Sequence, residues 1–126
     1  MQIYIHPGDE IPIYRQIVRQ VTDALAGGRL KPGERLPSHR ELAAQLVIAP
    51  LTVKKAYDEL EREGLIDTQR GRGTFGAEAP PRRDAAESRE RLRDAAQRLL
   101  SQAALAGVPF AAVLSLLEEI DKGMQS

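Results

Sequence analysis

Apolar residues recur at helical spacing in the first half of the chain, in three separate stretches. The first stretch begins after Pro12 and ends at Gly27–Gly28, where glycine readily takes the left-handed conformation that stops a helix. The second stretch carries Leu42 and Leu46. The periodic positions of the first and third stretches are Ile13, Ile17, Val21, Ala24 and Leu25, and then Val53, Ala56, Tyr57 and Leu60. The pattern predicts three helices that share one core.

The second and third helices are predicted to be joined by a tight turn. Ser38 and Glu41 have the spacing of a capping box, in which the serine hydroxyl accepts from the backbone amide three residues later. The turn is residues 47–50, and Pro50 suits the first position of a helix, because the amide hydrogen it lacks has no partner there. Two helices so joined predict a helix-turn-helix.

A short β-hairpin is predicted after Gly64. Residues 65–68 and 74–75 have strand character, and the glycine- and arginine-rich residues 69–73 connect them. Residues 29–37 are expected to form a turn that places Leu30 and Leu36 in the core. A hairpin beside a helix-turn-helix is a wing, so the expected domain is a winged helix-turn-helix over residues 1–76.

The rest of the chain is predicted to be a linker and a helical tail. Residues 77–87 are rich in proline and charge, which is typical of a linker. Residues 88–126 hold two further helical patterns, with Gly107 ending the first and Pro109 starting the second. Two such helices bury too little surface to be stable alone, and a second copy of the chain is the simplest partner. The expected dimer residues are Leu92, Leu99, Leu100, Phe110, Val113, Leu114, Leu117 and Ile120. The fold class is therefore mainly α with a small β-wing.

Composition limits the chemistry available to the chain. It has no cysteine and two histidines, which excludes disulfides and argues against a transition-metal site. Neither a phosphate-binding loop nor a nucleophile–base pair is evident, so we expect no enzyme activity and no cofactor. We also expect a cytoplasmic protein, because neither a signal peptide nor a membrane span is indicated. Net charge is zero, so any affinity for DNA must come from where the charges lie.

The motifs LPSHREL, TVKKAYDELEREGLI and GRGTF resemble those of the GntR family of bacterial transcription regulators. The resemblance covers residues 12–76 and implies DNA binding. A tail of about 50 residues is similar in size to that of the YtrA subfamily, whose members dimerise through it and usually repress transcription. A bacterial regulator of this type is expected to be associated with the nucleoid when bound to double-stranded DNA. Whether a small-molecule effector exists is left open.

The resemblance also implies where DNA would be contacted. The family arginine that follows the LPSx motif falls on Arg40, its third-helix contacts fall on residues 49–52 and 54, and its wing glycine falls on Gly71. Alanine at position 49 has no side chain that could cap the helix, and Leu51 offers only apolar contact, for instance with a thymine methyl. The candidate DNA-binding residues are Ser38, Arg40, Pro50, Leu51, Thr52, Lys54, Lys55, Arg70, Gly71 and Arg72.

Simpler interpretations stay open for these residues. Taken alone, Arg40, Lys54 and Lys55 would be solvated surface residues, and the glycine of the wing would only permit a tight turn. The function indicated is a sequence-specific regulator, most simply a homodimeric repressor at a palindromic operator. The alternatives are a winged helix that contacts protein or RNA, or a truncated relative of regulators fused to an aminotransferase-like domain.

Overall fold

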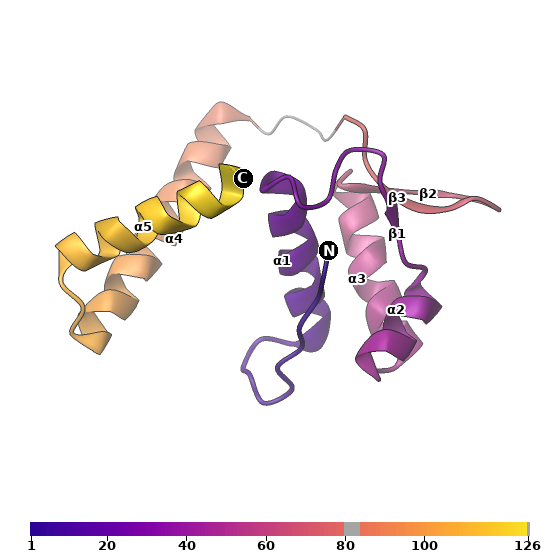
Figure 1. Cartoon of the computed structure of the whole chain (residues 1–126), viewed down its shortest axis with the longest axis horizontal. Helices are drawn as coiled ribbons and strands as arrows, with labels where there is room; N and C mark the ends of the chain where they lie inside the picture. Colours follow the sequence, from indigo (N-terminus) through magenta and orange to yellow (C-terminus); the bar gives the residue numbers. More distant parts are fainter. Residues whose placement is uncertain (80–83, 126) are drawn as a thin grey trace. The chain divides into compact units, whose positions relative to one another are not determined.

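Five helices and three short strands follow one another in residues 1–79 and 84–125, which the computed structural model describes (Figure 1). The chain divides into two compact units, Met1–Pro81 and Arg82–Ser126. The first unit contains α1 (Ile13–Ala26), β1 (Arg35–Leu36), α2 (His39–Leu46), α3 (Pro50–Arg62), β2 (Ile66–Gln69) and β3 (Gly73–Gly76). The second unit contains α4 (Ala85–Ala106) and α5 (Phe110–Gln125).

The core of the first unit lies between α3 and its two neighbours, α1 and α2. The four predicted core positions of α3 are all buried, as are Ile17 and Val21 of α1. Leu30 and Leu36 are also buried, as the sequence predicted, whereas Leu46 is only partly buried. Ile13 and Leu25 of α1 are likewise only partly buried and pack against the core. The helix periodicity therefore identified most of the core, and the fold is the predicted mainly helical one with a small sheet.

The sheet has one strand more than the sequence analysis predicted. β3 lies in the middle and pairs antiparallel with β2 on one side and β1 on the other. Arg35 lies opposite Phe75, and Leu36 lies opposite Thr74. Residues 29–37 were predicted to form a turn, which is incomplete, because Arg35 and Leu36 form a strand. A two-residue strand has no alternation of its own, so only its partner in β3 defines it.

Two glutamines of α1 hold the N-terminal segment of the chain against this helix. Gln20 accepts from the Tyr4 backbone amide at 2.9 Å and donates to the Tyr4 carbonyl at 2.6 Å. Gln16 accepts from the His6 amide at 2.8 Å and donates to the carbonyls of His6 and Ile11. The two glutamines are one helical turn apart. Their side-chain amides therefore bond to the backbone N–H and C=O groups of the extended segment, much as a neighbouring strand would. Ile3 is buried beneath it.

The second unit is a pair of helices joined at Gly107. α4 begins at Ala85, inside the segment 77–87 that was predicted to be a linker, and Asp84 Oδ1 accepts from the Ala86 amide at 3.2 Å. Pro80, Pro81, Arg82 and Arg83 of that segment lie outside the described residues. Gly107 has a φ of +70° and ends α4, as predicted. None of the helices in the described part of the chain is long and apolar enough to cross a membrane.

Candidate nucleic-acid interface

The start of α2 presents two of the predicted residues, Ser38 and Arg40. Ser38 Oγ accepts a hydrogen bond from the Glu41 amide at 3.1 Å, which is the predicted cap. Its hydroxyl hydrogen can still be donated to another acceptor, such as a phosphate oxygen. Arg40 is the second residue of α2 and is exposed. The start of α2 therefore carries a partly exposed donor and an exposed cation.

Tyr57 fixes α3 against the chain that leads into α2. Its hydroxyl donates to the Pro37 carbonyl at 2.8 Å, and its ring is buried. Burial raises the pKa of the Tyr57 hydroxyl, and the nearby charge of Glu41 raises it further. The hydroxyl therefore stays protonated and keeps donating, which holds Ser38 and Arg40 in place beside α3.

The turn between α2 and α3 is apolar and exposed. Val47 has a φ of 55° and ends α2 in the left-handed region, although it is β-branched. Ala49 precedes α3 without a side-chain cap, and Pro50 is the first helical residue. Leu51 is 78 % exposed. The solvent-facing start of α3 is thus built from hydrocarbon groups.

Two lysines follow within the next turn of α3, and each already has a partner. Lys54 Nζ lies 2.9 Å from Asp58 Oδ2, and both side chains are about half exposed. Lys55 Nζ lies 4.0 Å from the centroid of the Tyr14 ring, which comes from α1. The ring face attracts and orients this cation. Lys55 is therefore held in one place, while the charge of Lys54 is partly offset.

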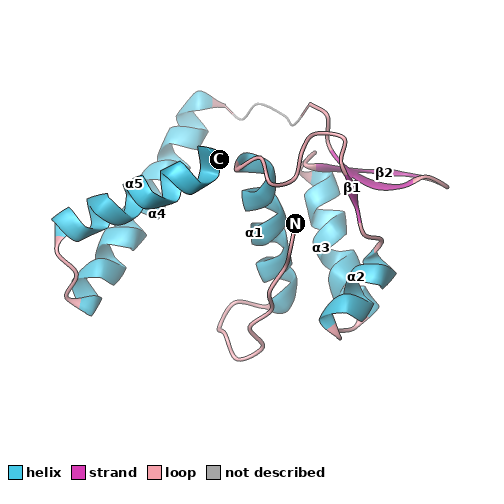
Figure 2. Ribbon diagram, in the orientation of Figure 1, coloured by secondary structure: helices cyan, strands magenta, loops and turns pink. Residues whose placement is uncertain are grey.

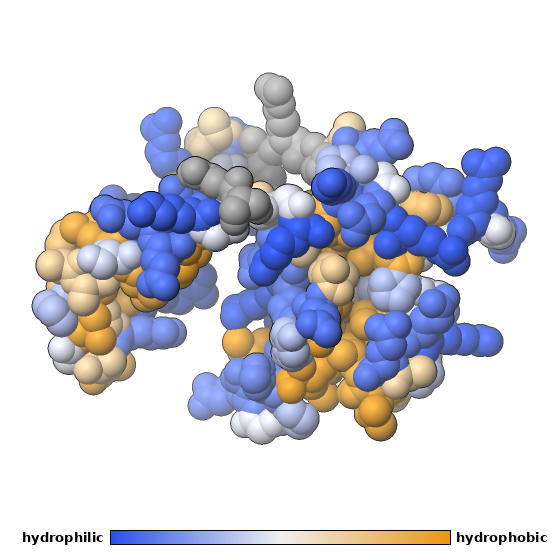
Figure 3. Space-filling model, in the orientation of Figure 1, coloured by the Kyte–Doolittle hydropathy of each residue, from blue (hydrophilic) through white to orange (hydrophobic). Residues whose placement is uncertain are grey.

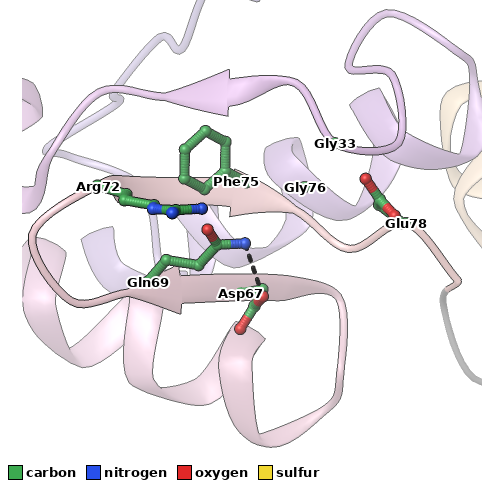
Figure 4. A pocket seen from close by; sticks show the side chains of 7 residues that line it. All are labelled: Gly33, Asp67, Gln69, Arg72, Phe75, Gly76 and Glu78. Atoms are coloured by element: carbon green, nitrogen blue, oxygen red, sulfur yellow. Dashed lines mark hydrogen bonds between the residues drawn. The ribbon is translucent and has the colours of Figure 1, made fainter.

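The wing is the hairpin of β2 and β3, which extends sideways from the C-terminal end of α3 (Figure 2). Gly71 at its tip has a φ of 79°, and a Cβ placed there would meet nothing within 4 Å. Arg70 and Arg72 are exposed on either side of it. The Arg72 side chain lies back along the hairpin, above Gln69, in a groove that Phe75 also lines (Figure 4).

The predicted residues of α3 and those of the wing lie toward opposite ends of α3. Pro50, Leu51 and Thr52 lie at its N-terminal end, whereas the wing follows its C-terminal end. A thirteen-residue helix is about 20 Å long at about 1.5 Å per residue. This spacing suits a surface in which a helix enters a major groove while a hairpin reaches the neighbouring backbone.

Three further basic or aromatic residues join this surface and were not singled out from the sequence. Tyr14 supports Lys55, and the Arg15 guanidinium lies 5.6 Å from the centroid of the same ring. Arg35 of β1 lies over the wing, so that a Cβ at Gly73 would come 3.1 Å from its Nε. Their positive charge could have marked Arg15 and Arg35 as candidate DNA-binding residues. Their positions on this surface depend on contacts between residues that are distant in sequence.

The described residues contain no cluster of three or more His, Asp or Glu side chains that could hold a metal ion. Two grooves lie on the first unit near the predicted residues. One of them runs between the start of α1 and the start of α3, lined by Pro12, Ile13, Tyr14, Leu51, Thr52 and Lys55. It is a surface depression beside the residues already described.

The tail leaves most of its predicted dimer residues exposed. Val113 is 2 % exposed and Leu99 is half-buried, whereas the other six predicted residues are exposed by 44 % or more. Within the described tail Val113 is the one buried side chain. Apolar side chains accordingly cover much of the visible surface of the helical pair (Figure 3).

The chain is similar to a known protein family and to a known repressor. Residues 13–75 match the family model described as bacterial regulatory proteins, gntR family. The chain is 40 % identical to the HTH-type transcriptional repressor YtrA of Bacillus subtilis over 94 % of this chain and 91 % of that protein.

Two solved structures extend the comparison. A transcriptional antiterminator from Listeria monocytogenes EGD-e is 29 % identical, with a TM-score of 0.79 over 100 % of this chain and 94 % of that chain. The DNA-binding domain of AraR in complex with operator ORX1 is 28 % identical, with a TM-score of 0.52 over 60 % of this chain and 93 % of that one.

The family model covers half of the chain, and the similarity to the repressor spans nearly all of it. The members of the family are DNA-binding transcription regulators, not enzymes, as the sequence analysis expected. This chain therefore belongs to the GntR family of bacterial regulatory proteins, and its similarity to YtrA extends through the two-helix tail.

Proposed function

We propose that the chain is a homodimeric transcriptional repressor that binds a palindromic operator in the cytoplasm, on nucleoid DNA. The observation that carries this proposal is the pairing of two surfaces. The first unit offers a helix-turn-helix with a basic wing, and the described tail offers exposed apolar side chains on both of its helices. The similarity to a named repressor and to a DNA-binding domain crystallised with its operator supports the same function.

Contact with DNA would be made by three parts of the first unit. Ser38 and Arg40 at the start of α2 would bind phosphates, as would Lys55 on its Tyr14 support. The N-terminal end of α3, from Pro50 to Lys54, would enter the major groove. Arg70 and Arg72, on either side of Gly71, would contact phosphates or the minor groove. Gly71 has no side chain, so the backbone of the wing can approach the DNA closely.

Dimerisation would bury the apolar face of the tail. Phe110, Leu114, Leu117 and Ile120 of α5 are each exposed by 44–62 %, which is costly for four large apolar residues on one helix. An isologous contact with the same face of a second copy would remove them from water. A two-fold dimer then presents two α3 helices to half-sites about one helical turn of DNA apart.

The test combines oligomeric state with DNA binding. Analytical ultracentrifugation of the full chain at micromolar concentration should give a dimer, and Leu117→Glu should give a monomer that binds a palindromic site far more weakly. Leu105→Glu is the matched control. Leu105 is 91 % exposed and lies on α4 outside the predicted face, so this variant should remain dimeric and bind normally. A monomeric wild-type chain, or a Leu117→Glu dimer, would contradict the proposed assembly.

Repression itself is tested by transcription in vitro from a promoter that overlaps the bound site. Adding the chain should reduce transcript, and Leu117→Glu should not. More transcript upon addition of the chain would show an activator and overturn this part of the proposal.

A further inference from the structure

The α2–α3 turn and the first two residues of α3 form an apolar surface. It lies at the N-terminal end of α3, which would face the DNA. We call residues 47–51 the apolar turn. Val47 is 89 % exposed and Leu51 is 78 % exposed, and Ala49 and Pro50 are exposed as well. Figure 3 shows apolar surface at the end of the first unit where α2 meets α3. Five successive residues there have no side chain that can donate or accept a hydrogen bond.

The polar side chains that follow are either sheltered or already paired. Thr52 is only partly exposed, Lys54 bonds to Asp58 at 2.9 Å, and Lys55 stacks on Tyr14. Direct reading of guanine, adenine or cytosine in the major groove relies on hydrogen bonds from side chains such as arginine, lysine, asparagine, glutamate or threonine. Residues 47–51 carry no such group, and the first side chains of these types in α3 are Thr52, Lys54 and Lys55.

One base edge in unmodified DNA fits such a surface. Thymine presents a C5 methyl group in the major groove, and apolar side chains read it by excluding water. Arg40, Lys54 and the arginines of the wing would bind phosphates of the DNA backbone on both sides of the groove. These contacts would place the apolar turn in the groove.

The backbone of Val47 gives a second and independent indication. A β-branched residue in the left-handed region is strained, and glycine or asparagine would fit there without that cost. Val47 contributes almost nothing to the core, because nearly all of its side chain faces solvent. An apolar side chain kept at a strained and exposed position points to a contact made outside the folded chain.

We propose that the apolar turn, and Leu51 above all, reads thymine methyl groups, so that the specificity of this chain comes from apolar contact rather than from a hydrogen-bonding code. The inference rests on the proposed function, and it names the chemistry of the bases that the site recognises. An operator half-site should then contain thymines at one or two fixed positions under the N-terminal end of α3.

The experiment compares thymine with uracil, because the two bases differ only in the methyl group. Duplexes that the full chain binds would first be selected from a random pool, and each thymine of the selected site would then be replaced singly by uracil. Replacement at the critical positions should weaken binding about fourfold, the effect of one buried methyl group. Replacement at the other thymines should have no effect.

Two variants of the full chain complete the test. Leu51→Ala should bind the thymine and uracil duplexes equally, since the contact is gone. Lys55→Ala is the control, and it should weaken both duplexes by the same factor while leaving the thymine preference intact. Leu51 is exposed, so its loss should not disturb folding.

The outcomes separate this inference from the proposed function. A selected consensus without thymines at fixed positions, or equal binding of thymine and uracil duplexes by the wild-type chain, overturns the methyl-reading inference alone. If no duplex is selected at all, the proposed function fails.

Discussion

The ammonium group of Lys55 lies 4.0 Å from the centroid of the Tyr14 ring, and this contact joins the start of α1 to the first half of α3. Neither residue is near the other in sequence. Tyr14 is half-buried and packs against the core, so the ring itself is held still. A lysine on a fixed aromatic face loses less conformational freedom when it meets a phosphate than a freely rotating one does.

Replacing Tyr14 by leucine should therefore weaken DNA binding. The ring face contributes about 0.5–1 kcal/mol to orienting an exposed cation, which corresponds to a loss of about twofold to fivefold in affinity. Tyr14→Phe keeps the ring and should bind like the wild type. Fluorescence anisotropy with one labelled duplex at fixed salt measures both. If Tyr14→Phe loses as much affinity as Tyr14→Leu, the hydroxyl and not the ring is responsible.

Removing the partner of Lys54 should strengthen DNA binding. Asp58→Asn eliminates a salt bridge of 2.9 Å whose two side chains are half exposed, so the stability lost is small, about 0.3–0.5 kcal/mol. Lys54 then faces the phosphates unpaired, and affinity for every duplex should rise about twofold at low salt. Asp23→Asn in the last turn of α1 makes the same change in net charge outside the predicted DNA-binding residues. An equal gain in both variants would mean that only the total charge matters.

The wing can be tested with two glycines that have nearly the same geometry. Gly71 and Gly28 have φ values of 79° and 75°, and a Cβ at either would meet nothing within 4 Å. Gly71→Val and Gly28→Val should therefore cost similar stability, about 1–2 kcal/mol each. Gly71→Val alone should reduce DNA affinity, by about tenfold or more, because the added side chain separates the wing from the DNA backbone. Thermal melting and gel retardation on both variants distinguish a binding role from a structural turn, and equal affinities would leave the wing as a turn only.

Relieving the strain at Val47 should stabilise the fold. Val47→Asn places a residue that tolerates the left-handed conformation at a position where 89 % of the side chain faces solvent. The gain should be about 1 kcal/mol, or roughly 4–8 °C in the Tm of a domain of this size. Differential scanning calorimetry measures it. A Tm that is unchanged or lower would show that the turn accommodates valine without cost.

Local signals in the sequence were enough to predict the helices and the hairpin. Periodic apolar positions, the Ser38 cap, Pro50 and the glycines at 64, 71 and 107 each determine structure within a few residues. The apolar face of the tail was also predictable, because Leu92, Leu117 and their neighbours repeat at helical spacing, and in the described tail most of them are exposed.

Contacts between distant residues were the part that the sequence could not supply. β1 exists because Arg35 and Leu36 pair with Phe75 and Thr74, and a two-residue segment has no pattern of its own. The binding of the N-terminal segment by Gln16 and Gln20 uses side-chain amides, which no hydrophobic period marks. The Lys54–Asp58 pair is different, since its i,i+4 spacing on a predicted helix was a usable signal.

The same limit applied at the candidate site. The basic residues could be identified in the sequence, but which of them contact other side chains of the same unit could not. Lys54 is paired within its own helix, Lys55 is held by α1, and Arg72 lies back along the wing. Each of these arrangements changes how much charge is available to a phosphate, and each depends on packing that brings separate segments together.

The most direct test of sequence-specific DNA binding is a titration of the full chain against its selected operator and a scrambled duplex of equal composition, repeated over a range of salt concentrations. We expect two chains to bind each operator, with an affinity about 10³-fold or more above that for the scrambled duplex. The logarithm of the binding constant should fall linearly with the logarithm of salt concentration for both duplexes. Equal affinity for the two duplexes, or no binding at low salt, would contradict the account.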